Sequence, residues 1–367
     1  MRECSLISFN EIINRIYLRT KDRGLPLQGS IELTFRCNLN CQHCYVGSLR
    51  RVPSHDELST TEIYRIIDEI VEAGCLYLLI TGGECLVRED FLDIYSYIKK
   101  KGIFPIVFTN GTLLNKDIVD YFVDYPPFVI EITLYGIREE TYESVTQVKG
   151  SFKRCMEGIK LLKGRGIYFD LKTVLCKLNY YEFLEIKEFA NKMGITNFRF
   201  DPILNGAIDG DNSLIFQLRL FPEEAIRIER LDSKKWEIIE EEYKKYGRVS
   251  LDFDFLYNCG AGKNTFHIDP YGRISMCMLS REPSFSLREN SFKEVFYESF
   301  PQLRNIKSKV RKEKCSGCEL SLLCLLCPGW AYLENGNPDS VAEYLCRLTK
   351  IRKEIINREV ESEKRLS

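Results

Sequence analysis

Three cysteines lie within eight residues in the run Cys37-Asn38-Leu39-Asn40-Cys41-Gln42-His43-Cys44. Thiolates spaced in this way, three residues and then two apart, can surround one compact inorganic group, and iron–sulfur clusters are held by such loops. A cluster of four irons needs four ligands, and this loop supplies three. The loop therefore predicts a cluster with one iron that is free to bind another molecule.

Zinc and disulfides are the alternatives for this loop. Structural zinc favours pairs of ligands, with a second pair to complete a tetrahedron, and no Cys or His pair follows nearby in the sequence. Disulfides belong to oxidising compartments, and the sequence opens with no signal-peptide pattern. Cluster ligation is the favoured interpretation.

A second group of cysteines lies between residues 259 and 346. Twelve residues separate Cys259 from Gly272, four more precede Cys277, and the run Cys315-x2-Cys318-x5-Cys324-x2-Cys327 is followed by Cys346. Taken alone, the two pairs with two-residue spacing favour zinc.

The composition limits the class of protein. Of the 367 residues, 44% are hydrophobic and 29% are charged, which is typical of a soluble globular protein. The net charge of −1 gives no basic footprint for nucleic acid, and no apolar run approaches the roughly 18 residues of a membrane span. Fifteen cysteines in a reduced cytoplasm, the expected location, indicate metal rather than disulfides. Five others are expected to be buried free thiols, namely Cys4, Cys75, Cys85, Cys155 and Cys176.

The elements that must position these residues follow an alternating pattern. Apolar strands are predicted at 31–36, 76–81, 104–108, 128–134, 168–175 and 197–202. Helical spacing lies between them, as in Ile63, Ile66, Ile67 and Ile70 with Gly74 as the stop, and three further helices are predicted around residues 91–98, 151–162 and 183–190. The alternation predicts an α/β fold, a partial (β/α)6 barrel of parallel strands with its functional groups at their C-terminal ends.

The second strand is followed by Thr81-Gly82-Gly83-Glu84. Glycines let the backbone approach a ligand closely, and a carboxylate can pair with a ligand ammonium group. A tight turn is an equal explanation for the motif alone. Its place, at the same end of the same sheet as the three-cysteine loop, indicates a site.

Together the Cys-x3-Cys-x2-Cys loop and Gly-Gly-Glu resemble the radical S-adenosylmethionine (SAM) superfamily, over residues 31–202. The resemblance implies that Cys37, Cys41 and Cys44 hold a [4Fe–4S] cluster and are the catalytic cysteines. It also implies that the open iron binds the amino and carboxylate groups of SAM, and that Gly82, Gly83 and Glu84 line the methionine amine.

Further cofactor contacts follow from the resemblance or from position at strand ends. His43 stands where the family often has Tyr, so its ring is expected near the adenine, and Cys85 stands where Pro is frequent. Thr133 keeps a hydroxyl expected near the ribose, while Tyr135 replaces an acid. By position alone, further candidates are Asn110, Lys172, Asn179, Arg199 and Asp201, and each could equally be structural.

The C-terminal cysteines resemble the auxiliary-cluster extension called SPASM, over residues 249–350, although the family usually has three residues between the last two cysteines of the central run. The resemblance implies two auxiliary [4Fe–4S] clusters, three in all. One would be held by Cys315, Cys318, Cys324 and Cys346, and the other by Cys259, Cys277 and Cys327. Two four-iron clusters have eight ligand positions, and these cysteines supply seven thiols. The difference suggests a second open iron that could bind a substrate thiolate or water.

The predicted domains are a lead-in (1–30), the radical SAM partial barrel (31–204), a helical bridge (205–248), the SPASM domain (249–350) and a charged tail (351–367). Within the SPASM domain, His267–Ile274 reads as a β-hairpin whose turn is Asp-Pro-x-Gly.

The implied function is reductive cleavage of SAM to a 5′-deoxyadenosyl radical, which abstracts hydrogen from a substrate. On family grounds the substrate is a ribosomally synthesised peptide that receives an oxidative crosslink, a thioether or C–C bond. The expected partners are that precursor peptide, a separate leader-recognition protein, and a low-potential electron donor such as flavodoxin or ferredoxin.

Three alternatives stay open: sulfatase-type maturation, dehydrogenation of a small metabolite, and a non-catalytic iron–sulfur electron-transfer protein. The last of these has no need for Gly-Gly-Glu. No general base can be assigned, and Tyr135, Asp201 and Asp269 are candidates by position only.

Overall fold

The structure is a computed structural model that describes residues 23–52, 54–246, 254–315 and 326–366, together with residues 16, 19, 20, 318, 320 and 324. Most of the predicted lead-in, residues 1–30, lies outside these residues.

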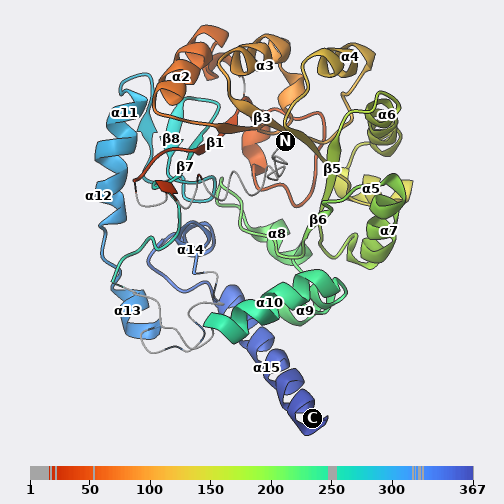
Figure 1. Cartoon of the computed structure of the whole chain (residues 1–367), viewed down its shortest axis with the longest axis vertical. Coiled ribbons are helices and arrows are strands. Elements are labelled where there is room, and N and C mark those ends of the chain that lie inside the picture. The colour runs from red at the N-terminus through yellow and green to blue at the C-terminus, as the bar shows by residue number, and fades with distance from the viewer. Residues whose placement is uncertain are drawn as a thin grey trace, which may run out of the picture.

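Six parallel strands form the centre of the molecule, with helices around their outer side (Figure 1). The strands are β1 (Gln28–Glu32), β2 (Tyr77–Thr81), β3 (Phe104–Thr109), β4 (Val129–Thr133), β5 (Phe169–Val174) and β6 (Arg199–Asp201). The helices are α2 (Thr60–Glu72), α3 (Phe91–Lys100), α4 (Lys116–Asp124), α5 (Glu139–Thr146), α6 (Ser151–Gly164) and α7 (Phe183–Met193). The predicted α/β class and parallel sheet are confirmed, and α4 and α5 are additional to the helices predicted by residue.

Helix α2 forms where its sequence predicts it. The Ser59 hydroxyl accepts a hydrogen bond from the Glu62 amide, and the Glu62 carboxylate accepts one from the Ser59 amide, which satisfies two amides at the helix start. The four isoleucines of the predicted stripe are all buried.

The first strand lies earlier than the predicted 31–36. Leu33 and Phe35 are only 1% and 3% exposed, which explains the apolar pattern. The chain nevertheless leaves the sheet after Glu32, because the carbonyls of Thr34 and Arg36 accept hydrogen bonds from the turn that follows β2. The loop that carries the three cysteines is therefore longer than predicted.

The predicted hairpin is present as the antiparallel pair β7 (Thr265–Ile268) and β8 (Arg273–Ser275), followed by β9 (Phe285–Ser286). Strand β7 also pairs in parallel with β1, so the sheet has nine strands in the order β6-β5-β4-β3-β2-β1-β7-β8-β9. The hairpin is thus continuous with the barrel sheet, and the C-terminal ends of β1 and β7 lie on the same edge.

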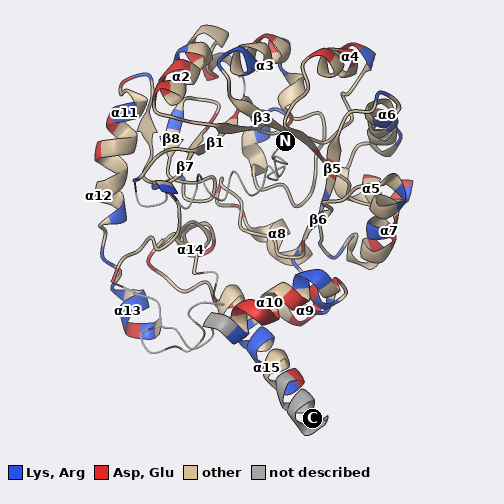
Figure 2. Ribbon diagram, in the orientation of Figure 1, with Lys and Arg blue, Asp and Glu red and all other residues tan. Residues whose placement is uncertain are grey.

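Helices form most of the remaining C-terminal half. They are α8 (Ser213–Leu218), α9 (Pro222–Arg230), α10 (Ser233–Tyr246), α11 (Phe292–Glu294), α12 (Phe300–Arg304), α13 (Val310–Cys315), α14 (Pro328–Asn335) and α15 (Glu343–Leu366), with a π-helical segment at Val295–Ser299. The charged segment predicted as a tail continues α15. Figure 2 shows that the charged residues concentrate on the helices around the sheet.

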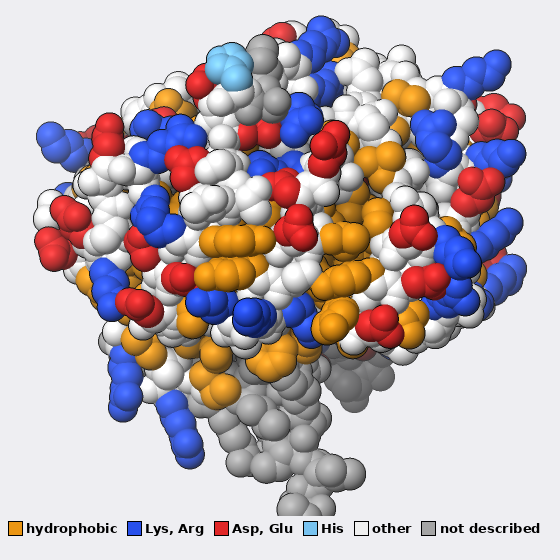
Figure 3. All heavy atoms as spheres, turned by 90° about the horizontal axis from the view of Figure 1, so that it is seen from above, with side chains coloured by type: hydrophobic (Ala, Val, Ile, Leu, Met, Phe, Trp, Pro, Cys, Tyr) orange, Lys and Arg blue, Asp and Glu red, His pale blue; other side chains and the backbone are white. Residues whose placement is uncertain are grey.

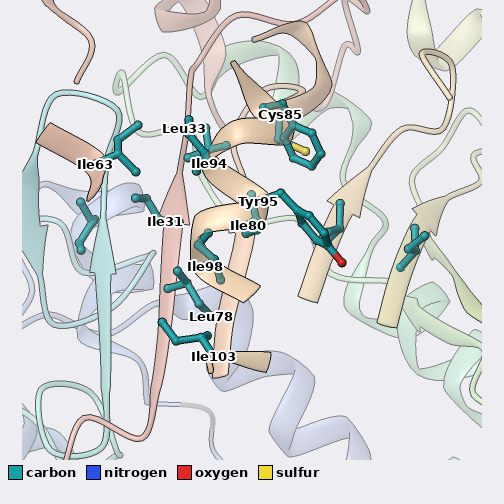
Figure 4. Close-up of a cluster of buried hydrophobic side chains, with 14 of the residues drawn as sticks. Ile31, Leu33, Ile63, Leu78, Ile80, Cys85, Ile94, Tyr95, Ile98 and Ile103 are labelled. Carbon is teal, nitrogen blue, oxygen red and sulfur yellow. The ribbon is translucent and has the colours of Figure 1, made fainter. Parts of the chain in front are cut away.

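The main core lies between the sheet and its helices. Figure 4 shows Ile31 and Leu33 from the first strand and its loop, Leu78 and Ile80 from β2, and Ile94, Tyr95 and Ile98 from α3 packed together. Cys75, Cys85, Cys155 and Cys176 are buried free thiols, as expected, and Cys4 lies outside the described residues.

The outer surface mixes charges of both signs with hydrophobic side chains on the face seen in Figure 3. Among the described helices, none combines the length and the apolar character that crossing a membrane would require.

Candidate functional site

The loop from Cys37 to Cys44 lies between β1 and a 3-10 helix at Gly47–Arg51. Two of its amides bond to the end of α5: Asn40 N donates to Thr146 O at 2.9 Å and Gln42 N donates to Val145 O at 3.1 Å. The Arg50 guanidinium donates to the Cys41 carbonyl at 3.0 Å. Groups far away in the sequence therefore fix the backbone of the loop.

The three thiols share one environment. Burial and the neighbouring thiols of Cys44 and Cys37 raise the pKa of Cys41 well above its usual range. Burial, with the Glu84 carboxylate second, raises the pKa of Cys37 to about 12. Burial of Cys37 and Cys41 therefore disfavours their thiolate forms, and a bound metal removes that cost because its ligands are thiolates. The donor set therefore fits an iron–sulfur cluster.

Gly82 and Gly83 are required by close contact with this loop. Gly82 has φ +143°, and a Cβ there would lie 2.2 Å from the Thr34 carbonyl oxygen; a Cβ on Gly83 would lie 2.3 Å from the Phe35 oxygen. The Gly83 amide donates to Thr34 O at 2.8 Å. The sequence predicts that these glycines let the backbone approach a ligand. In the structure they let the turn after β2 approach the segment that leads into Cys37.

Glu84 connects this turn to β3. One carboxylate oxygen accepts hydrogen bonds from Leu86 N (3.1 Å) and the Thr109 hydroxyl (2.9 Å), and the other accepts one from Asn110 N (2.7 Å). Burial raises the pKa of Glu84, and these bonds oppose the shift. The side-chain amide of Asn110 in turn donates to Asn38 Oδ1 at 2.9 Å, and its nitrogen lies 3.8 Å from the Cys37 sulfur. Two predicted cofactor residues are thus joined to the cysteine loop.

His43 and Tyr135 pack together beside the thiols. Their rings meet edge to face with centroids 5.1 Å apart. Burial lowers the pKa of His43 to about 4, so its ring is neutral near pH 7, and its Nδ1 is buried with no hydrogen-bond partner among the described residues. Burial and the thiols raise the pKa of Tyr135 well above its usual range. This phenol is therefore a poor general base near neutral pH.

Lys172 and Arg199 form a separate group with Glu131 on neighbouring strands. The Lys172 ammonium lies 3.8 Å from the Glu131 carboxylate and 2.9 Å from the centroid of the Phe108 ring, and Arg199 pairs with the same carboxylate. Burial lowers the pKa of Lys172. Thr133 is paired with Lys172 in the β4–β5 register. No hydrogen bond or ion pair joins Lys172 or Arg199 to the cysteine loop within the described part of the chain.

Three other candidates make local structural bonds. Asn179 donates to the Tyr135 carbonyl at 2.9 Å, Asp201 accepts from Ile203 N at 2.9 Å, and Asp269 accepts from two amides of its own hairpin turn. Burial raises the pKa of both aspartates.

Five C-terminal thiols line a cavity of about 300 Å³: Cys315, Cys318, Cys324, Cys327 and Cys346. The pKa of Cys324 is raised to about 11 by burial and by the thiols of its expected group. The pKa of Cys327 is raised by burial and then by Cys277 and Cys259, the other expected group. The thiols thus interact within the two sets predicted above.

Within the described residues, no three His, Cys, Asp or Glu side chains are grouped so as to hold one metal ion.

A buried charged network was missed by the sequence analysis. Glu32 is fully buried at the end of β1. Its carboxylate accepts hydrogen bonds from both terminal nitrogens of Arg281, at 2.8 and 2.9 Å, and from the Tyr45 hydroxyl, at 2.5 Å. It also lies 3.2 Å from His267 Nε2. Although burial raises the pKa of Glu32, Arg281 and His267 lower it more, to well below its usual range. Tyr45 follows Cys44, and Arg281 lies four residues after Cys277. The network therefore ties the two cysteine regions together, and the parallel β1–β7 pairing brings Glu32 and His267 close.

Comparison with known proteins agrees with this arrangement. The radical SAM superfamily profile matches residues 31–190, and the profile described as an iron–sulfur cluster-binding domain, SPASM, matches residues 259–319. AdoMet-dependent heme synthase of Methanosarcina barkeri is 28% identical over 83% of this chain and 92% of its own length. The antilisterial bacteriocin subtilosin biosynthesis protein AlbA of Bacillus subtilis is 27% identical over 77% of this chain and 60% of its own length.

Among solved structures, Streptococcus suis SuiB bound to S-adenosylmethionine has the same fold, with a TM-score of 0.68 and 17% identity over 94% of this chain and 82% of that one. SuiB bound to its precursor peptide SuiA gives a TM-score of 0.67, with 16% identity over 94% of this chain and 82% of that one. The two domain matches identify the protein as an enzyme with a radical SAM domain at residues 31–190 and a SPASM domain at residues 259–319, and these segments contain the first cysteine loop and Cys259, Cys277, Cys315 and Cys318.

Proposed function

We propose that Cys37, Cys41 and Cys44 hold the [4Fe–4S] cluster that binds SAM, and that the enzyme modifies a ribosomally synthesised peptide. The observation that carries the first part is the three-thiol loop, fixed by α5 and by the Gly-Gly-Glu turn at the C-terminal edge of the sheet. When bound, such a cluster supplies the electron that cleaves SAM to a 5′-deoxyadenosyl radical.

The chain's own residues would bind and orient the cofactor. The neutral His43 ring offers an apolar face and an unbonded nitrogen. Glu84 holds Asn110, and the Asn110 side chain contacts Asn38 and Cys37 of the loop. A fixed loop keeps the reacting groups aligned, which is the main contribution that a protein makes to such chemistry.

Two auxiliary clusters are part of the proposal. Cys315, Cys318, Cys324 and Cys346 would complete one of them, and Cys259, Cys277 and Cys327 would leave one iron of the other open. The Tyr257 hydroxyl bonds the Ser280 hydroxyl at 2.9 Å. Burial raises the pKa of Tyr257, and the thiols of Cys259, Cys327 and Cys277 raise it further, which indicates that this hydroxyl lies near the second set. Spectroscopy that finds four protein ligands on this cluster, with no change on adding substrate, would reject the open iron.

A peptide substrate is supported by similarity to proteins named for peptide biosynthesis and to SuiB with its precursor peptide. A leader-recognition protein and a flavodoxin or ferredoxin belong to the same proposal. The cytoplasm remains the expected location.

SAM cleavage tests the proposed centre directly. After anaerobic reconstitution and reduction, the enzyme is expected to release 5′-deoxyadenosine, and Cys41→Ala should lower the rate at least about a hundredfold, since one cluster ligand is lost. Cys75→Ala is the matched control, because Cys75 is also a buried thiol but lies outside the cysteine groups. Equal rates for the two variants would refute the assignment of the loop.

A second candidate substrate is an iron porphyrin. It is favoured by the similarity to AdoMet-dependent heme synthase, which extends over 92% of that protein. Incubation with iron coproporphyrin III, SAM and reductant separates the candidates: porphyrin conversion with no peptide product would replace the peptide assignment.

A further inference from the structure

A second cavity lies between the two cysteine regions. Its volume is about 250 Å³, and its walls include Phe35 and Leu49 from the two sides of the first cysteine loop and Leu279 from the segment after Cys277. The Leu279 amide lies 3.4 Å from the Cys277 sulfur. An occupant of this cavity would therefore lie beside both loops.

Half of the lining residues are apolar or aromatic, and the other half are polar or charged. Phe35 and Tyr271 pack edge to face with centroids 5.7 Å apart, and Ile208 and Leu333 add aliphatic surface. An apolar cavity of about 150 Å³ is enough to bind benzene, and aromatic rings favour such edge and offset contacts. The volume and the walls suit one bicyclic aromatic side chain and are too small for a porphyrin.

Among the described residues, two carboxylates of the cavity have acceptor oxygens that no hydrogen bond uses: Glu282, which is exposed, and Asp269, which is half-buried. Arg281 is engaged by Glu32, and Arg273 donates to the Ser284 hydroxyl at 2.8 Å. Asp269 uses Oδ1 to accept from the Tyr271 and Arg273 amides, both at 2.9 Å. Among the described residues, no hydrogen bond reaches its Oδ2. The cavity thus presents an oxygen acceptor beside aromatic walls.

We propose that this cavity is a subsite for an aromatic side chain of the peptide substrate, whose N–H or O–H donates to Asp269 Oδ2. The proposal rests on the peptide function above and names the class of residue that the enzyme selects. Because the hairpin turn after β7 carries Asp269, the parallel β1–β7 pairing brings this acceptor to the edge where the cysteine loop lies.

Indole and indene test the subsite, because they have the same ring shape and only indole carries a hydrogen-bond donor. Binding to the reconstituted full-length enzyme is measured by saturation-transfer NMR. Asp269→Asn keeps an oxygen for the two turn amides but replaces Oδ2 by a donor, so indole should bind about tenfold more weakly, while indene is unchanged. Ile208→Trp should fill the cavity and abolish binding of both probes.

Glu289→Gln is the control, because it removes an exposed carboxylate that follows the same hairpin; it should leave both affinities unchanged. Indole binding that neither Asp269→Asn nor Ile208→Trp alters would overturn the proposal. So would tighter binding of n-butylamine than of indole, which would indicate a cationic side chain. SAM cleavage is assayed in the same samples, and its absence from the unsubstituted enzyme would reject the proposed function independently of probe binding.

Discussion

The two cysteine regions differ in what holds them in place. The backbone of the first loop bonds to α5 and to the turn after β2, which are distant in the sequence. In the second region the described backbone bonds of the thiol residues are mostly local, such as Cys318 N to Cys315 O and Cys324 N to Leu320 O. Two arginines are long-range braces there: Arg311 donates to the carbonyls of Leu256, Leu326 and Pro338, and Arg304 donates to those of Cys259 and Ala261. The first loop is thus held through its backbone by the barrel, and the described part of the second region is held by side chains, so we expect the second region to depend more on the cluster that it binds.

Gly83→Ala is expected to have the largest effect, because it breaks the fixed loop. The new Cβ would lie within 2.3–2.4 Å of two backbone oxygens, so the chain leading into Cys37 must move. Unfolding experiments should show a loss of about 4–5 kcal/mol, and SAM cleavage should fall with it. Gly164→Ala is the control, since nothing lies within 4 Å of a Cβ at this helix end, and it should be neutral or slightly stabilising. Equal effects would contradict the fixed loop.

Glu32→Gln breaks the network between the regions. Arg281 would keep a largely buried charge without its partner, which costs about 3–5 kcal/mol. Chemical denaturation of the reconstituted enzyme measures this loss. Glu72→Gln removes an exposed partner of Lys293 and should cost less than about 1 kcal/mol. If Glu32→Gln is as mild as this control, the network does not join the regions.

Removal of iron is expected to affect the second cysteine region more than the first. After chelation, hydrogen exchange in α14, next to Cys327, should rise by roughly tenfold or more, while α5 beside the first loop changes by less than about twofold. Mass spectrometry of the two segments before and after chelation measures both rates. Equal loss of protection would show that the first loop also depends on its cluster.

Lowering the pH is expected to have the smallest effect on the free energy of unfolding. The folded pKa of Glu32 lies below its ordinary value of 4.5, so its stabilisation is complete above about pH 4.5 and is lost as the pH falls toward the folded value. Below pH 4.5 the free energy of unfolding should fall by up to about 1.4 kcal/mol per pH unit from this group. Glu32→Gln should remove that part of the slope in urea titrations of the iron-free protein, and an unchanged slope would assign the acid sensitivity to other groups.

Much of the fold could be predicted from local patterns. The isoleucine stripe and Ser59–Glu62 pair of α2 are local signals, as is the hairpin turn at Asp269. The end of β1 could not be predicted, because Leu33 and Phe35 are as buried as strand residues and only contacts with Gly82 and Gly83 turn the chain.

Part of the candidate site could likewise be predicted from short motifs, and part of it could not. The cysteine spacing and Gly-Gly-Glu are short motifs, so they could be predicted and their geometry is compact. The Glu32–His267–Arg281 network and the second cavity join segments more than 200 residues apart. The network and the cavity both depend on the parallel pairing of β7 with β1, which no local sequence pattern predicts.

Electron paramagnetic resonance of the reduced enzyme with and without SAM tests the central claim most directly. We predict that SAM changes the signal of one cluster, and that a variant with Cys37, Cys41 and Cys44 all changed to Ala loses this response while keeping about two thirds of its iron, the share of two clusters among three. A triple variant that still responds to SAM would contradict the account.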